Sequence, residues 1–231
     1  MSRRDLWEQR MADVHFTAPE YQADGSFQSV TYEYSGDVET GWTVERDGHE
    51  FLHLGPGYDL VESAYCGVCS TDLARRFLPY PLPQIIGHEV VARHHGRPVV
   101  IEINASHAAR GLTDIQCAFC NNDMNTQCPH RITLGIDRLP GGFAPYILAP
   151  INAIVPIPEN VSELAAALTE PFAAALQGVE ATAPREQDRV AVLGPRRLGS
   201  LIIAALAGYR NREQADFEIA AIARHDHLLK L

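Results

Sequence analysis

The stretch CGVCSTD, from Cys66 to Asp72, decides which fold and which chemistry the rest of this 231-residue chain supports. Two cysteines separated by two residues are typical of a redox pair or of half a zinc site, and one of them can also be idle. A second pair, CAFC, follows at Cys117 and Cys120, with 47 residues between Cys69 and Cys117. Pairs that share one tetrahedral ion usually lie about 15–20 residues apart. The spacing therefore argues against one site made of four cysteines.

The sequence around this stretch has the pattern of β-strands. From Ser29 to about Ile154, short runs rich in β-branched and aromatic residues are separated by turn residues; the runs are SVTYEY, FLHLG, DLVESAY, IIGHEVVARH and RPVVIEI. This pattern predicts an all-β barrel or sandwich. A thioredoxin-type pair should lie at a helix N-terminus in a β-α-β unit, so the redox interpretation is weak here. Residues 1–27 are polar and turn-rich, and we expect a loosely attached extension there.

The pattern changes near Pro156 from strands to helices. Residues 162–183 are rich in alanine and leucine and predict a helix, with Ser162 as its N-cap and a break or a new first turn at Pro171. DRVAVLGPRRLGSLIIAALAGY then predicts a strand, a glycine-containing turn and a helix, and DFEIAAIAR predicts a second strand. This order is a β-α-β unit, which begins a parallel sheet.

Composition and charge limit the class of partner. With 46% hydrophobic and 21% charged residues the composition is that of a globular protein, and the net charge of −10 argues against nucleic acid, whose phosphates attract basic surfaces. The start has no apolar signal segment, and the longest apolar run, LGSLIIAALAGY, is shorter than the about 20 residues that cross a membrane. We expect a cytoplasmic protein without a membrane partner. Five clustered cysteines in that compartment indicate metal binding or reactivity rather than disulfides.

The surroundings of Cys69 point to a metal. Gly87, His88 and Glu89 begin 18 residues later, and a thiolate, an imidazole and a carboxylate suit catalytic zinc, which keeps one position open. GGFAPY begins at Gly141, and EPFAAAL follows it. On these four motifs the chain resembles the zinc-dependent medium-chain dehydrogenases, the alcohol, polyol and sugar dehydrogenase family. GVCSTD is similar to the catalytic-zinc loop of that family, and GHE to its second zinc motif.

The resemblance implies a mixed β and α/β fold. A GroES-like β-barrel catalytic domain would occupy 28–183, with a zinc lobe at about 104–140. Residues 184–231 would form the first β-α-β part of a Rossmann-type nucleotide-binding domain. Family members are longer and have a six-stranded nucleotide domain, whereas this sequence ends after two of those strands. The second domain is therefore expected to be partial, in a C-terminally truncated member, and we expect weak or no hydride transfer from the chain as it stands.

The resemblance also implies the ligands of the catalytic zinc. Cys69 and His88 would bind the ion. Glu170 stands where sugar and polyol members carry a glutamate ligand and simple alcohol dehydrogenases carry a cysteine. Glu89 would be a carboxylate that alternates with a ligand or supports one.

Three other residues of the opening stretch take different roles by the same resemblance. Thr71 stands at the hydroxyl that relays the alcohol proton, while zinc acts as a Lewis acid on the substrate oxygen. Asp72 is expected to orient the loop or a ligand rather than to react. Cys66 stands where the family has a small apolar residue, and we interpret it as a core residue.

The second cysteine group has the spacing of a structural-zinc lobe. Cys117, Cys120 and Cys128 match the last three ligands of that lobe in the family, and Asp114 stands where the first cysteine belongs. Aspartate can ligate zinc, so one carboxylate and three thiolates are a reasonable set. Such an ion would hold a loop with little core of its own. The alternative is a lobe that has lost its metal and keeps three packed thiols.

The cofactor motif is a variant of a glycine-rich turn. VLGPRRLG aligns Gly194 and Gly199 with two glycines of the family's G-x-G-x-x-G, and Arg196 with the glycine between them. That glycine lets the backbone approach the pyrophosphate, so the arginine either obstructs the phosphates or pairs with them.

The end of the second predicted strand bears on the choice of dinucleotide. NAD-binding members carry an acid there, whereas this sequence places Arg224 and His225 at about that position. Positive charge favours a 2′-phosphate, so NADP is preferred over NAD. Asp226 keeps NAD as the alternative, and a solvated strand end without any phosphate contact is a second one.

Two functions remain open on the sequence. The first is an enzyme that transfers hydride between a small alcohol, polyol or sugar and NAD(P). The second is a non-catalytic zinc-binding or interaction module derived from that family. Family members are commonly dimers or tetramers, but their interface lies largely in later strands of the nucleotide domain, so a homo-oligomer is left open as well.

Overall fold

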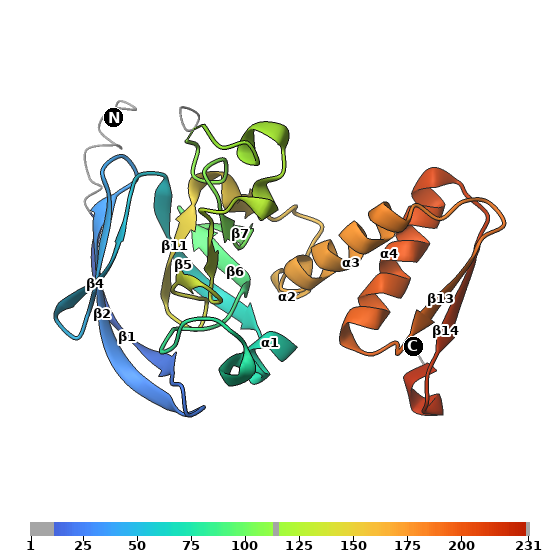
Figure 1. The fold of residues 1–231 in the computed structure, drawn as a ribbon, viewed down its shortest axis with the longest axis horizontal. Coiled ribbons are helices and arrows are strands. Elements are labelled where there is room, and N and C mark those ends of the chain that lie inside the picture. The colour runs from blue at the N-terminus through green and yellow to red at the C-terminus, as the bar shows by residue number, and fades with distance from the viewer. Residues whose placement is uncertain (1–11, 113–115, 230–231) are drawn as a thin grey trace. The chain divides into compact units, whose positions relative to one another are not determined.

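A computed structural model describes residues 12–112 and 116–229 of the chain (Figure 1). The chain divides between Ala167 and Leu168 into two compact units. No helix among the described residues combines the length and the apolar character that a membrane crossing requires.

The first unit begins with a four-stranded antiparallel sheet in which each strand pairs with the next along the chain. Its strands are β1 (Ala12–Tyr21), β2 (Phe27–Asp37), β3 (Gly41–Arg46) and β4 (His49–Leu54). Alternate residues of β2 are buried, namely Val30, Tyr32 and Tyr34. This period of two presents one face of the sheet to a core, as the sequence predicted.

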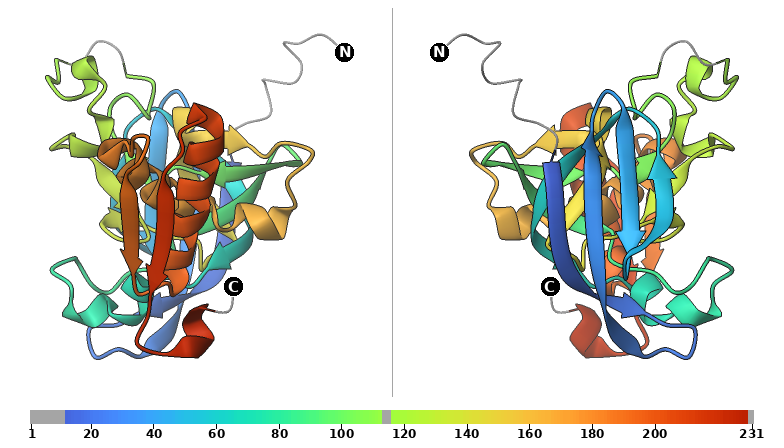
Figure 2. Two further views of the ribbon diagram at one scale, coloured as in Figure 1. Left: turned by 90° about the vertical axis from the view of Figure 1, so that its right-hand side faces the viewer. Right: turned by 90° about the vertical axis from the view of Figure 1, so that its left-hand side faces the viewer.

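A five-stranded antiparallel sheet supplies the other side of that core (Figure 2). In spatial order its strands are β11 (Tyr146–Pro150), β5 (Tyr58–Gly67), β6 (Glu89–His94), β7 (Arg97–Ile101) and β12 (Ile154–Pro156). Buried side chains from both sheets, Trp42 and Ile147 among them, form one hydrophobic cluster. The predicted β-barrel architecture is confirmed.

Short elements complete the first unit. The irregular segment that carries the three later cysteines is anchored by a small sheet and two helical turns. The short elements are α1 (Ser70–Leu73), η1 (Arg75–Phe77), β8 (Asn104–Ala105), η2 (Cys120–Asn122), η3 (Asn125–Gln127), β9 (Ile132–Leu134), β10 (Arg138–Leu139), η4 (Ile151–Ala153) and α2 (Glu163–Ala166). Ser162 caps α2 as predicted, because its hydroxyl accepts a hydrogen bond from the Ala165 amide at 3.2 Å.

The structure differs from the sequence interpretation at the N-terminus. Residues 1–27 were expected to form a loosely attached extension. Residues 1–11 lie outside the described part of the chain, but β1 pairs with β2 along its whole length. Phe16 and Ala18 point into the core, and Phe16 packs edge-on against Tyr34. The segment looks polar in sequence because its outward positions are polar and because one of its inward residues is Glu20.

Glu20 is fully buried, and its charge is satisfied by neighbouring strands. Its carboxylate accepts hydrogen bonds from the Tyr32 hydroxyl, from the Arg46 guanidinium, with Nε at 2.7 Å, and from the Gln22 amide. Burial alone would raise the pKa of Glu20, but these bonds and the positive charge of Arg46 together lower it. The carboxylate thus links β1 to β2 and β3 in its charged form.

We expect Glu20→Gln to lower the free energy of unfolding by about 2 kcal/mol at pH 7, because it leaves Arg46 without its partner. The pKa of Glu20 is lowered in the folded state, so its contribution is complete above the unfolded value near 4.5 and is lost as the pH falls. Urea unfolding at pH 7 and at steps below 4.5 should show the difference from wild type shrinking. Glu50→Gln, at an exposed position of β4, is the matched control. An equal loss in both variants would contradict this role.

The second unit contains the predicted β-α-β order. Its elements are α3 (Thr169–Thr182), β13 (Arg189–Leu193), α4 (Arg197–Glu213), β14 (Glu218–Ile222) and η5 (Asp226–Leu229). β13 and β14 are parallel and pair over their whole length, with α4 as the connection between them (Figure 1). Pro171 lies in the first turn of α3, where proline is tolerated.

The boundary between the units lies earlier than the predicted change at 183/184. α3 was expected to end the barrel domain. Its buried residues Ala175 and Val179 instead share a small core with Val192 of β13 and Leu206 of α4. Since the apolar side of a helix determines where it packs, α3 belongs with the second unit.

Candidate active site and cysteine lobe

The turn after β5 places Cys69 at the start of α1. Asp72, three residues later, accepts a hydrogen bond from the Cys69 amide at 2.8 Å, which forms a capping box for this short helix. Gly67, at the end of β5, pairs with Glu89, the first residue of β6. A β-carbon at Gly67 would lie 2.1 Å from a carboxylate oxygen of Glu89, so only glycine lets that side chain occupy its place. The motif thus sets Cys69 and Glu89 beside each other.

Three metal-ligating side chains converge here. One donor atom from each of Cys69, His88 and Glu89 lies within 4.8 Å of the others. His88 and Glu89 are buried, and Cys69 is half-buried. The Thr71 hydroxyl lies 3.6 Å from the Cys69 sulfur. A thiolate, an imidazole and a carboxylate form a donor set that zinc accepts, with a polar hydroxyl adjacent.

Asp72 supports this cluster from behind. It is buried, its Oδ1 accepts a hydrogen bond from the Gly87 amide at 3.3 Å, and the same oxygen faces His88 Nδ1 at 3.5 Å, which is long for a hydrogen bond. Burial would lower the pKa of His88, but the Asp72 carboxylate and the Cys69 sulfur outweigh it and raise that pKa to about 9. Because Nδ1 faces Asp72, Nε2 is the nitrogen left for a metal, as is usual for carboxylate-supported histidine ligands.

Cys66 has a different environment from Cys69. It packs against the barrel core and within 2.8 Å of the β-carbon positions of Gly87 and Gly142, where side chains would displace it. Burial and the nearby Asp72 carboxylate raise the pKa of Cys66 to about 12, so its thiol stays protonated at neutral pH. The two cysteines of the opening stretch are therefore chemically distinct, with Cys66 in the core as expected.

Glu170, which the resemblance suggested as the third ligand, lies in the first turn of α3 and is half-buried. That position is in the second unit, so its assignment stays a prediction. Within the first unit, Glu89 is the carboxylate that lies with Cys69 and His88.

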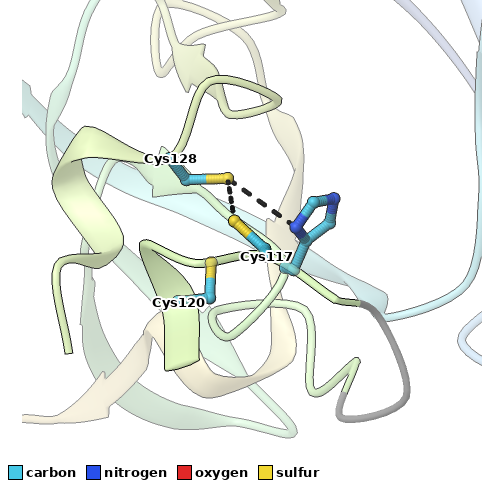
Figure 3. A group of neighbouring side chains, drawn as sticks. Cys117, Cys120 and Cys128 are labelled. Carbon is cyan, nitrogen blue, oxygen red and sulfur yellow. Dashed lines mark hydrogen bonds between the residues drawn. The ribbon is translucent and has the colours of Figure 1, made fainter. Parts of the chain in front are cut away.

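The cysteine lobe brings its three thiols together, as the spacing suggested (Figure 3). The sulfur atoms of Cys117 and Cys128 lie 3.9 Å apart, and Cys120 belongs to the same cluster. The fourth member is His107, whose Nδ1 lies 3.7 Å from the Cys128 sulfur. Asp114, the fourth ligand expected from sequence, lies outside the described residues.

The spacing of these atoms fits a tetrahedral metal rather than a disulfide. Zn–S bonds near 2.3 Å place two thiolates about 3.8 Å apart and a thiolate and an imidazole nitrogen about 3.5 Å apart. The observed 3.9 Å and 3.7 Å are close to both values. Hydrogen bonds from the Cys120 backbone and from His107 lower the pKa of Cys117 to about 6, which favours the thiolate that a metal needs.

His107 escaped the sequence analysis although a signal was present. It lies in NASHAARG, at the start of the irregular segment and ten residues before Cys117. Sites of three cysteines and one histidine are common for structural zinc, so any histidine in that segment was a candidate. The family spacing pointed to position 114 instead.

The second unit places the predicted glycine turn at the end of a strand. Gly194 follows β13 with φ of +77°, and its amide donates to the Ile222 carbonyl at the end of β14. A β-carbon on Gly199 would lie 2.4 Å from the Gly194 carbonyl, so a glycine is needed where α4 approaches the turn. Arg196 is the N-cap of α4 and is exposed, as is Arg197. Two guanidinium groups therefore lie at a helix N-terminus, where the helix dipole favours anions.

A pocket of about 530 Å³ adjoins this turn. Its walls come from α3, β13 and the first half of α4, and they include Gly194, Leu198 and Gly199. Arg224 and His225 follow the end of β14 and are exposed. In parallel α/β sheets ligands bind outside the carboxyl ends of the strands, which is the end where this glycine turn and these basic residues lie.

Comparison with known proteins supports the resemblance. Residues 55–159 match the family model of the alcohol dehydrogenase GroES-like domain. L-threonine 3-dehydrogenase of Pectobacterium carotovorum is 31% identical over 187 residues, which are 74% of this chain and 52% of that protein. L-galactonate-5-dehydrogenase of Escherichia coli is 30% identical over 169 residues, 67% of this chain and 47% of that protein. A sorbitol dehydrogenase of Halalkalibacterium halodurans is 29% identical over 151 residues, covering 61% and 43%.

Solved structures agree on the fold. Galactitol-1-phosphate dehydrogenase from Escherichia coli has a TM-score of 0.68 at 20% identity, covering 93% of this chain and 57% of that one. CAD from Helicobacter pylori, complexed with NADP(H), has a TM-score of 0.67 at 16% identity, covering 94% and 61%. The similarity to medium-chain dehydrogenases and the GroES-like fold class are thus confirmed. The chain spans about half the length of the curated relatives named above.

Proposed function

We propose that this chain carries the zinc-binding part of an oxidoreductase that transfers hydride between an alcohol, polyol or sugar hydroxyl and NAD(P). The observation that carries the proposal is the convergence of Cys69, His88 and Glu89, with the Asp72 carboxylate behind His88. The relatives are dehydrogenases of small hydroxyl compounds, which supports the reaction class.

The residues divide the work between holding a metal and moving a proton. Cys69 and His88 would hold zinc, with Glu89 or Glu170 as a third donor, and a bound zinc ion supplies a Lewis acid that makes a substrate hydroxyl more acidic. Thr71 presents its hydroxyl beside Cys69, where it can accept the substrate proton and pass it toward solvent. In the proposed reaction the carbinol carbon would lose a hydride, which carries two electrons, to NAD(P), and the hydroxyl oxygen would lose one proton, which leaves a carbonyl product. Asp72 holds the ligand loops in register.

The cysteine lobe would have a structural role. Cys117, Cys120, Cys128 and His107 supply four donors, which is the number typical of structural zinc. The irregular segment around them has few buried apolar side chains, so a bound ion would replace a core there.

The dinucleotide would bind at the turn after β13. The exposed Arg196 and Arg197 at the N-terminus of α4 suit a pyrophosphate, and Arg224 beyond β14 suits a 2′-phosphate. We therefore propose NADP in preference to NAD.

Cys69→Ser should remove about one zinc ion per chain and any alcohol, polyol or sugar oxidation that the wild type shows, because the thiolate ligand is lost. Zinc is counted by plasma mass spectrometry after dialysis, and turnover is followed by nicotinamide absorbance across a polyol and sugar panel. Cys66→Ser is the matched control, since that neighbouring thiol packs in the core. Unchanged zinc in Cys69→Ser would overturn the assignment.

His107→Ala should likewise lose about one zinc ion per chain and lower the melting temperature, because one of four lobe donors is removed. His130→Ala controls for loss of an imidazole, since its ring stands 5.3 Å from that of His107 but lies outside the ligand cluster. Asp114→Asn distinguishes the two candidates for the fourth donor. Zinc loss in Asp114→Asn with retention in His107→Ala would return the role to the aspartate.

Arg224→Ala should weaken NADPH binding about tenfold, the value of one charge-assisted hydrogen bond, with little effect on NADH. Nicotinamide fluorescence titrations measure both. Arg185→Ala is the control, because this exposed arginine precedes β13 at the opposite end of the sheet. Zinc retention with no binding of either dinucleotide would contradict the cofactor assignment and favour the non-catalytic zinc module.

A further inference from the structure

Another group of possible metal ligands, which contains two imidazoles, lies at the other end of β6 from the Cys69 cluster. Asp59 of β5 and the adjacent His94 and His95 bring one donor atom each within 4.8 Å of the others. β6 begins at Glu89 and ends at His94, so at about 3.3 Å per residue the two groups are about 16 Å apart along the strand. None of the three residues has a role in the function proposed above.

The turn between β6 and β7 explains how two adjacent histidines reach one carboxylate. His94 pairs with Arg97, so His95 and Gly96 form a two-residue hairpin loop. Both have positive φ, of 51° and 74°, as a type I′ turn requires. Adjacent side chains on a strand point to opposite faces, but the left-handed backbone at His95 turns its ring alongside that of His94. The ring centroids are 3.8 Å apart.

The carboxylate is oriented toward both rings. Oδ1 of Asp59 accepts a hydrogen bond from the Leu60 amide at 2.9 Å, which leaves Oδ2 to face the histidines. Nε2 of His94 lies 2.7 Å from Oδ2, and Nε2 of His95 lies 3.7 Å from it. A backbone bond that fixes a carboxylate in this way is typical of the support behind metal ligands.

The distances suit a bound cation. Metal–nitrogen and metal–oxygen bonds of about 2.0–2.1 Å in tetrahedral geometry separate neighbouring donors by about 3.3 Å, and the observed 2.7 Å and 3.7 Å lie on either side of that value. The side chains of Asp59 and His94 are 14% and 23% exposed, and that of His95 is 46% exposed. The donors are therefore partly sheltered, and an ion can reach them from solvent.

We propose that Asp59, His94 and His95 form a metal site for a divalent transition ion of the zinc and nickel class, separate from the Cys69 cluster and from the cysteine lobe. Two imidazoles and one carboxylate suit these ions and lack the thiolates that softer ions prefer. Binding replaces the His94–Asp59 hydrogen bond and needs both rings neutral, so a proton carried by the group is released to solvent. The ion would tie the β6–β7 hairpin to β5.

Ni²⁺ is the probe, titrated by calorimetry into untagged protein of known zinc content. Wild type should bind one Ni²⁺ without a thiolate charge-transfer band in the near ultraviolet, because the donors are nitrogen and oxygen. Asp59→Asn and His95→Asn should weaken binding at least about tenfold. Asparagine followed by Gly96 is itself a favoured type I′ pair, so His95→Asn removes the imidazole while preserving the hairpin. His53→Ala, at an exposed position of β4, should bind as wild type does.

Absence of Ni²⁺ binding by wild type would overturn the proposal, as would unchanged affinity in Asp59→Asn and His95→Asn. A thiolate band that accounts for all the bound nickel would overturn it too, since the ion would then be at the cysteines. Cys69→Ser should retain this Ni²⁺ site whatever becomes of its zinc. Failure of the dehydrogenase proposal is therefore distinguishable from failure of this one.

Discussion

The Asp72 carboxylate is the group on which the candidate active site depends. One oxygen accepts from the Cys69 amide, and the other accepts from the Gly87 amide and faces His88. These two loops lie 18 residues apart, at opposite ends of the connection between β5 and β6. A buried carboxylate that satisfies amides of both loops fixes the distance between a thiol and an imidazole before any ion arrives. Its negative charge also compensates a cation on His88 or a bound metal, at a site where burial alone would disfavour charge.

The sheets make this arrangement precise because β5 and β6 are neighbours. Pairing of Gly67 with Glu89 brings the ends of the two strands together, so the residues just beyond one strand and at the start of the next lie close together. The requirement for glycine at position 67 follows from the Glu89 side chain that occupies the space of a β-carbon. β6 then runs from Glu89 to the hairpin at His94 and His95. One pair of strands thus supports two groups of potential ligands at opposite ends.

Short-range patterns in the sequence predicted much of the secondary structure. The strand runs, the Ser162 cap and the β-α-β unit follow from alternation, capping chemistry and the order of elements, which are local properties. The family resemblance, which rests on the motifs around them, predicted that Cys69 and His88 lie together. The errors share another cause. Glu20 made β1 look like a solvated arm, because sequence does not reveal that Tyr32 and Arg46 satisfy a buried carboxylate.

Tertiary contacts account for what the sequence could not supply. His107 lies ten residues before Cys117, and its contact with the Cys128 sulfur depends on the folded arrangement of the lobe. α3 follows the barrel in sequence, yet its buried side packs on α4 and β13. His94 ends one of the predicted strand runs and His95 follows it, and their relation to Asp59 depends on the backbone conformation of His95. In each case the sequence shows the residue or helix, but it does not show which distant residues that residue or helix contacts.

The division of the chain into two units bears on which residue would be the third ligand of the proposed zinc ion. Cys69, His88 and Glu89 all belong to the first unit, so that unit contains three donors without any residue from α3. Glu170 belongs to the second unit, and its assignment as a ligand stays a prediction. With Glu89 as the third ligand, the proposed metal site is complete within the barrel, and the proposed dinucleotide site is a separate feature of the β-α-β unit.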